Sequence, residues 1–183
     1  MNQIRTPENL FIGKNLIGSG IEHISRTLGD ISAIFEYGDQ ITALQAMDIA
    51  YSVSSYLPEK EGTPGGLYFG ITRLNAGSVN GEYYMTKGHF HANIDTAEFY
   101  WGIEGEGVLI LMDDQGNVRG ERMFPGSLHY IPGRTAHRVA NTSDTSLSFG
   151  ACWPSNAGHN YGTIEKNGFT ARLKNINGKP QFV

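Results

Sequence analysis

The sequence predicts an all-β fold, built as a barrel or a sandwich with one or a few short helices. Three features support this class: 24 of the 183 residues are Gly, short β-rich runs recur, and turn-forming residues separate the runs. Short strands joined by tight turns are typical of jelly-roll barrels. We expect strands at Ala50–Tyr56, Leu67–Leu74, Glu82–Thr86, Ala97–Ile103, Gly107–Met112, Val118–Phe124, Ser127–Ile131, His137–Ala140 and Leu147–Trp153.

The breaks between these runs carry turn residues, as in Asn75-Ala-Gly77 and Pro125-Gly126. Gly38–Asp48 is the segment that predicts a helix, with Asp39 as its candidate N-cap. The chain shows no internal repeat and no linker long enough to divide it. We therefore interpret residues 1–49 as an N-terminal arm that packs on the barrel or on a dimer partner, and residues 50–183 as the barrel domain.

Composition excludes several classes of protein. A mass of 20.1 kDa fits one domain, and a net charge of −4 without any Lys/Arg run makes nucleic acid and anionic membranes poor partners. The single Cys152 excludes an internal disulfide framework and fits a reducing compartment. The first residues contain no apolar stretch of the signal-peptide type, and no segment approaches the length of a membrane span. We expect a cytoplasmic protein.

Four residues indicate a metal centre: His89, His91, Glu98 and His137. Two His two positions apart on a strand point to the same side, and Glu98 begins the next strand-like run. Three imidazoles and a carboxylate suit Fe, Mn, Ni, Co or Zn and leave positions free for a substrate. A single His in a β-protein is usually structural, but four converging polar side chains are costly inside a barrel unless a metal compensates them.

Two motifs resemble those of the cupin superfamily. The second one, Gly126, Pro132, His137 and Asn141, matches closely, except that Arg134 replaces the usual Gly, so we expect Gly133 to build that turn. In the first motif, six residues separate His91 from Glu98, whereas the common cupin pattern leaves three or four. This departure resembles one cupin branch, the archaeal-type glucose-6-phosphate isomerases.

The resemblance to that branch covers roughly residues 45–170. It includes Thr86-Lys-Gly-His-Phe-His-Ala92, Ala97-Glu98-x-Tyr100 and Ala157-Gly-His-Asn-Tyr-Gly-Thr-Ile164. It implies a double-stranded β-helix, the cupin jelly-roll barrel, that interconverts glucose 6-phosphate and fructose 6-phosphate. It also implies a homodimer and one divalent metal per chain, with His89, His91, Glu98 and His137 as ligands.

The resemblance also suggests roles for the residues around the metal. Glu98 is either the base that moves a proton between C1 and C2 or purely a ligand, and a metal-assisted hydride shift is the competing mechanism. Lys87 is expected to point away from the substrate. The expected substrate-binding residues, which hold the phosphate or line the pocket, are Tyr51, Thr72, Thr86, Gly88, Tyr100, His159 and Tyr161.

Three other functions fit the same residues. The scaffold could isomerise another sugar phosphate, and three His with one Glu also serve iron dioxygenases. A non-catalytic sugar-phosphate or metal sensor is the third alternative. The chain carries no attached DNA-binding motif that would favour the sensor.

Overall fold

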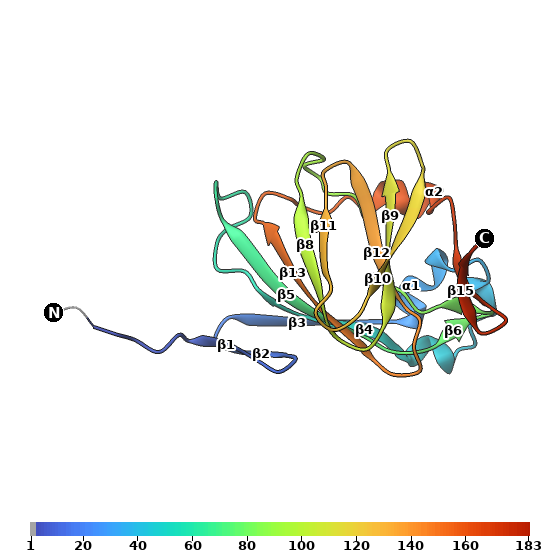
Figure 1. Ribbon diagram of the computed structural model, residues 1–183, viewed down its shortest axis with the longest axis horizontal. Helices are drawn as coiled ribbons and strands as arrows, with labels where there is room; N and C mark the ends of the chain where they lie inside the picture. Colours follow the sequence, from blue (N-terminus) through green and yellow to red (C-terminus); the bar gives the residue numbers. More distant parts are fainter. Residues whose placement is uncertain (1–2) are drawn as a thin grey trace.

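The computed structural model describes residues 3–183, and its largest element is an antiparallel six-stranded sheet. The strands lie in the order β11-β8-β13-β5-β4-β3. Because the connections cross between sheets, strands that are distant in the sequence become neighbours, as Figure 1 shows for β8 and β13. Their bounds are β3 Ile21–Thr27, β4 Ile49–Tyr56, β5 Leu67–Leu74, β8 Glu98–Glu104, β11 Leu128–Ile131 and β13 Leu147–Pro154.

A second, three-stranded sheet lies across from the first (Figure 1). It consists of β10 (Val118–Met123), β9 (Gly107–Asp113) and β12 (Thr135–Asn141), with β9 in the middle. Residues of both sheets, such as Leu109 and Phe149, join one buried apolar cluster, so the core lies between the sheets. The predicted all-β class, a jelly-roll barrel with few short helices, is confirmed.

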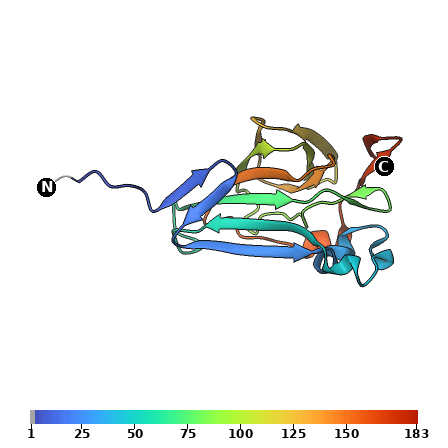
Figure 2. The same ribbon diagram turned by 90° about the horizontal axis from the view of Figure 1, so that it is seen from below.

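Smaller elements occupy the two ends of the molecule. Figure 1 shows that the N-terminal segment extends away from the barrel while the C-terminus lies at the opposite end, and Figure 2 shows the first hairpin beside the large sheet. That hairpin pairs β1 (Asn9–Ile12) with β2 (Asn15–Gly18). The C-terminal end carries a four-stranded sheet of β15 (Lys179–Phe182), β14 (Leu173–Ile176), β7 (Glu82–Tyr83) and β6 (Ser78–Val79).

The helix predicted over Gly38–Asp48 is wrong. The segment instead forms two single 3₁₀ turns, η2 (Gly38–Gln40) and η3 (Gln45–Met47). Leu44 and Met47 are 79% and 74% exposed, so the segment buries little apolar surface beyond Ile41, and so short a helix is marginal without packing.

The helices that do form are short. They are α1 (Leu28–Ile31), the 3₁₀ turn η1 (Ser32–Ile34) and α2 (Gly162–Asn167). Thr27 and Asp30 form a capping box that starts α1. No helix within residues 3–183 is long and apolar enough to cross a membrane.

Most of the predicted strands form close to their expected bounds, and β5 matches Leu67–Leu74. The strand predicted over Glu82–Thr86 ends early, at Tyr83. Three strands lie within residues 3–48, and β3 pairs with β4 along its length to form the edge of the large sheet. No pattern in the sequence predicted these strands, or β14 and β15 near the C-terminus.

The turn that leads into β12 differs from expectation. Arg134, and not Gly133, adopts the left-handed conformation, with φ of 62°. Gly133 is needed for another reason, since a Cβ atom there would lie 2.6 Å from the backbone oxygen of Asp95. Two contacts hold Arg134 in place: its amide donates to the carbonyl of Ile94 at 2.6 Å, and its Nε lies 2.8 Å from Asp95 Oδ1. These contacts offset the cost of about 1–2 kcal/mol for the left-handed conformation.

Candidate metal centre

The backbone brings the candidate ligands together from three segments. His89 and His137 form an isolated antiparallel bridge and exchange backbone hydrogen bonds, so their side chains lie on the same side and their ring centroids are 4.4 Å apart. His91, two residues after His89, places its ring centroid 5.6 Å from that of His89. Glu98 is the first residue of β8. Sequence positions spanning almost fifty residues therefore converge on one point.

The four side chains present a compact set of donor atoms. One donor atom from each of His89, His91, Glu98 and His137 lies within 4.8 Å of the others. Glu98 Oε1 is 2.5 Å from His137 Nε2 and 3.3 Å from His91 Nε2. His91, Glu98 and His137 are at most 5% exposed. A set of this composition and spacing can hold one divalent metal ion.

Hydrogen bonds on the far side of two rings fix which nitrogens can bind a metal. Nδ1 of His91 lies 2.8 Å from the carbonyl of Thr96, and Nδ1 of His137 lies 3.2 Å from the carbonyl of Thr135. A carbonyl only accepts, so each Nδ1 must carry the proton. In the neutral ring the opposite atom, Nε2, then points a lone pair at the Glu98 carboxylate. Such backbone partners are typical of metal-binding His.

Several of the inward-facing atoms meet only one another, and Glu98 Oε1 lies within ion-pair distance of His137 Nε2 and His91 Nε2. His89 Nε2, His137 Nε2 and Glu98 Oε1 are buried and make no hydrogen bond. Buried polar atoms are normally paired, because an unpaired one costs about 1–3 kcal/mol. Electron-rich atoms that face one another in this way are stabilised by a cation between them, either a proton on a ring nitrogen or a metal ion. The donor set therefore fits a divalent metal.

The charge states of Glu98 and His89 fit the same interpretation. For His91, burial alone would lower the pKa, but Glu98 outweighs it and raises that pKa. Burial alone would raise the pKa of the Glu98 carboxyl, but His137 and His91 outweigh it and lower that pKa to about 2. Burial, reinforced by the neighbouring His137, lowers the pKa of His89 well below its usual value. At neutral pH the centre therefore offers an ionised carboxylate and a neutral His89 imidazole, the forms in which these side chains bind metals.

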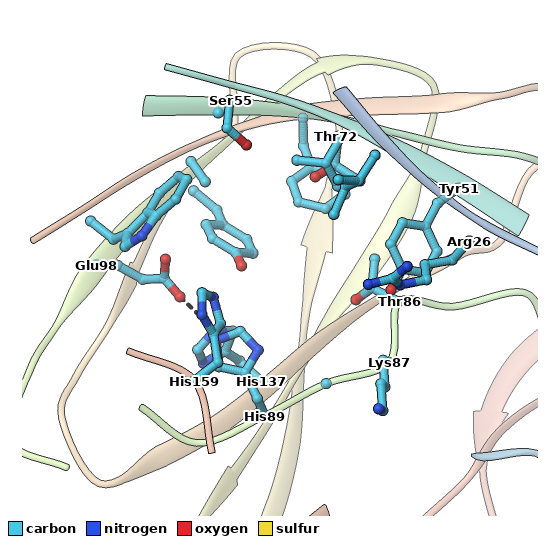
Figure 3. Close-up of a pocket in the computed structure, with 18 of the residues that line it drawn as sticks. Arg26, Tyr51, Ser55, Thr72, Thr86, Lys87, His89, Glu98, His137 and His159 are labelled. Carbon is cyan, nitrogen blue, oxygen red and sulfur yellow. Dashed lines mark ion pairs between the residues drawn. The ribbon is translucent and has the colours of Figure 1, made fainter. Parts of the chain in front are cut away.

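A cavity of about 230 Å³ opens beside this group, and the inner face of the large sheet forms its wall. His89, Glu98 and His137 line it. His91 belongs to the same donor group but does not line the cavity. All of the predicted substrate-binding residues also line it, namely Tyr51, Thr72, Thr86, Gly88, Tyr100, His159 and Tyr161. Figure 3 shows Glu98 and the His side chains on one side of the cavity and Tyr51 with Thr86 on the other. The cavity therefore has an end that could hold a metal and a hydroxyl-rich end.

Two cationic residues outside the predicted set also line the cavity. Lys87 forms part of the cavity wall, but its Nζ turns to Glu165, as expected of a side chain that points away from the substrate. This Nζ lies 2.6 Å from Glu165 Oε1 and 4.6 Å from the ring centroid of Tyr161. Arg26, on β3 within residues 1–49, lines it as well. No pattern in the sequence marked Arg26, because only the pairing of β3 with β4 brings it to the cavity.

The model of the family described as "Glucose-6-phosphate isomerase (GPI)" matches residues 25–181, a range that contains the candidate metal-binding group, Arg26 and β4. The chain belongs to the glucose-6-phosphate isomerase family. The glucose-6-phosphate isomerase of Thermococcus litoralis is 42% identical over 131 residues, which cover 72% of this chain and 68% of that protein. The enzyme of Thermococcus onnurineus is 36% identical over 165 residues, which cover 90% and 86%. That of Pyrococcus furiosus is 39% identical over 135 residues, which cover 74% and 70%.

Solved structures similar to this chain include oxalate decarboxylase from Bacillus subtilis. It aligns with a TM-score of 0.46 at 18% sequence identity, over 61% of this chain and 27% of that chain. The family expected from the sequence motifs is confirmed by the family match and by the curated relatives.

Proposed function

We propose that this chain is a metal-dependent aldose–ketose isomerase that interconverts glucose 6-phosphate and fructose 6-phosphate. The observation that carries the proposal is the set of unpaired buried atoms, on His89, Glu98 and His137, at the wall of a cavity lined by hydroxyl groups. Membership of the glucose-6-phosphate isomerase family supports the reaction and the substrate. One divalent ion per chain, of Fe, Mn, Ni, Co or Zn, would be held by these three residues and His91.

A bound divalent ion would polarise the sugar carbonyl and stabilise the developing enediolate charge. Glu98 is ionised at neutral pH because its pKa is about 2, which favours the role of ligand. A general base works best when its pKa is near the working pH, so Glu98 is a weak base unless bound substrate changes its environment. Loss of deuterium from C2 to solvent during turnover would indicate a proton shuttle, and its transfer to C1 a hydride shift.

Other residues at the metal-binding end can orient the sugar. Burial and the nearby Glu98 raise the pKa of Tyr100 well above its usual value, so the phenol stays protonated and can donate to a sugar oxygen. The ring of His159 lies 4.5 Å from that of His89 and stacks on Tyr161. Partial burial lowers the pKa of His159, and a neutral imidazole can exchange a proton with a sugar hydroxyl.

The hydroxyl-rich end is the proposed phosphate site. It carries the side chains of Tyr51, Thr72 and Thr86 and the backbone of Gly88. The Oγ1 of Thr86 accepts a hydrogen bond from the amide of Val139 at 3.1 Å, which leaves its hydroxyl proton free to donate. Oriented O–H and N–H donors hold an oxyanion well.

We also propose that the chain forms a homodimer and acts in the cytoplasm. The outer face of the large sheet carries exposed apolar residues, Phe99 at 45%, Leu128 at 68% and Tyr130 at 55%, and Phe99 packs on Tyr130 at 5.3 Å between ring centroids. Phe11 of the first hairpin contacts the same face at Phe69. Large exposed apolar patches mark interfaces, and a second copy with its own N-terminal segment would cover this one. The single free Cys152 supports a reducing compartment.

A coupled isomerase assay tests the proposal. Purified protein is stripped of metal, reloaded with each divalent ion and assayed against a panel of aldose phosphates, while an oxygen electrode follows the same preparation. We expect metal-dependent turnover of glucose 6-phosphate without oxygen uptake. Faster turnover of a different aldose phosphate would show that this sugar, and not glucose 6-phosphate, is the preferred substrate. Rapid oxygen consumption without isomerisation would favour a dioxygenase, and binding without turnover would favour a sensor.

A further inference from the structure

Two cationic side chains, Arg26 and Lys87, reach the cavity. A phosphate dianion bound at the hydroxyl-rich end would be stabilised most by a cation that is not already paired with a carboxylate of the protein. The contacts of the two side chains distinguish them.

The charge of Lys87 is already balanced. Its Nζ lies 2.6 Å from Glu165 Oε1, on α2, and over the ring of Tyr161. To reach an anion in the cavity, Lys87 would have to give up both contacts. Lys87 therefore fastens α2 to the segment that carries His89, and contributes little net charge to the cavity.

Arg26 has no such partner. Among residues 3–183, no carboxylate lies within ion-pair distance of its guanidinium, and no side-chain hydrogen bond involves it. Asp30 is close enough to feel its charge, but the Asp30 carboxylate accepts from the amide of Thr27 in the capping box of α1. The side chain also reaches solvent, so its charge stands at the mouth of the cavity.

The sheet register aims Arg26 at the proposed phosphate site. Arg26 lies directly opposite Tyr51 in the β3–β4 pair, and such residues point to the same face. The register shifts immediately after Arg26, a bulge of the kind that often re-aims a side chain beside an active site. Figure 3 shows Arg26 next to Tyr51 and Thr86, across the cavity from Glu98. Burial raises the pKa of the Tyr51 phenol, and the Arg26 charge opposes that rise.

We propose that Arg26 is the cation that binds the phosphate of the substrate, and that Lys87 is not. The inference rests on the proposed function for the identity of the substrate. Arg26 would make the site prefer phosphorylated sugars over free sugars, because the planar fork of N–H donors on its guanidinium matches the oxygens of a phosphate. It also means that β3, within the segment interpreted as an arm, completes the site.

The test titrates inorganic phosphate into the metal-loaded protein by calorimetry and compares three variants that each remove one positive charge. Arg26→Gln should weaken phosphate binding about tenfold, the effect of losing one exposed charge-assisted hydrogen bond. Lys87→Gln should change it by less than about threefold, since Glu165 balances that charge. Arg73→Gln, on the outer face of the same sheet, removes the same charge far from the cavity and should leave phosphate affinity unchanged. In the isomerase assay Arg26→Gln should raise KM for glucose 6-phosphate more than it lowers kcat, and Arg26→Lys should recover part of the loss.

Metal content is measured on every variant, so a loss of the metal is not mistaken for a loss of the phosphate site. Unchanged phosphate binding in Arg26→Gln, or a larger loss in Lys87→Gln, would overturn the inference. The titration uses no sugar, so its result stands whether or not the protein isomerises glucose 6-phosphate. If the protein is an active isomerase but Arg26→Gln leaves phosphate affinity unchanged, the proposed function stands and only the assignment of Arg26 is refuted.

Discussion

Replacing Thr86 by Val tests the hydroxyl-rich end of the cavity, because the two side chains have the same shape and differ in one hydroxyl. In the structure this hydroxyl accepts from the amide of Val139, a fully buried residue. Removing it leaves that amide unpaired, at a cost of about 1–3 kcal/mol. A chain of this size loses about 2–4 °C in Tm per kcal/mol, so Tm should fall by roughly 2–12 °C.

The same substitution removes a proposed donor to the phosphate. A hydrogen bond to a charged group contributes about 1.5–3 kcal/mol, so kcat/KM for glucose 6-phosphate should fall by roughly 10-fold to 150-fold. The rate with free glucose should change little, and the preference for the phosphorylated sugar should narrow. Thr86→Ser keeps the hydroxyl and should retain both Tm and preference. Thermal melts and coupled assays measure the two effects. If Thr86→Val has the Tm of the wild type and keeps the full preference for glucose 6-phosphate over free glucose, the reasoning is refuted.

Further predictions concern the metal, the substrate and the assembly. Chelation should lower Tm, and reloading should restore it, because a ligand at 100 times its Kd stabilises the folded state by about 2.7 kcal/mol; equal melting curves would argue against a bound ion. Wild-type protein should turn over free glucose at least two decades more slowly than glucose 6-phosphate, for a loss of about 3 kcal/mol; equal rates would remove the basis for the phosphate site. Phe99→Asp and Tyr130→Asp should convert a dimer to a monomer in light scattering with metal content retained, whereas a wild-type monomer would refute the proposed interface.

The sequence predicted the barrel strands well because each is a short β-rich run bounded by turn residues. The convergence of His89, His91, Glu98 and His137 was predictable for a similar reason. His89 and His91 share a strand-like segment, and Glu98 begins the next run. The distant His137 stands in a second motif with Gly126 and Pro132, which marked it in the sequence as well.

The features that the sequence did not predict depend on contacts between distant segments. β3 is an edge strand whose residues are mostly exposed, so it lacks a buried apolar face and becomes recognisable only through its pairing with β4. Arg26 was missed with it. Lys87 was expected to point away from the substrate, but its ion-pair partner Glu165 is remote in the sequence and was not predicted. The helix predicted over Gly38–Asp48 fails because nothing in the fold covers Leu44 and Met47.

Elemental analysis of His91→Ala and His137→Ala tests the central claim most directly, that these residues with His89 and Glu98 bind a metal. His129→Gln provides the control, because His129 is also buried but bonds to Ser127 and Glu121 outside the group. We predict about one ion per chain in the wild type and in His129→Gln. In the two ligand variants, affinity should fall at least as far as the 10-fold to 100-fold typical of losing a supporting residue. Full metal occupancy in both His91→Ala and His137→Ala would contradict the account.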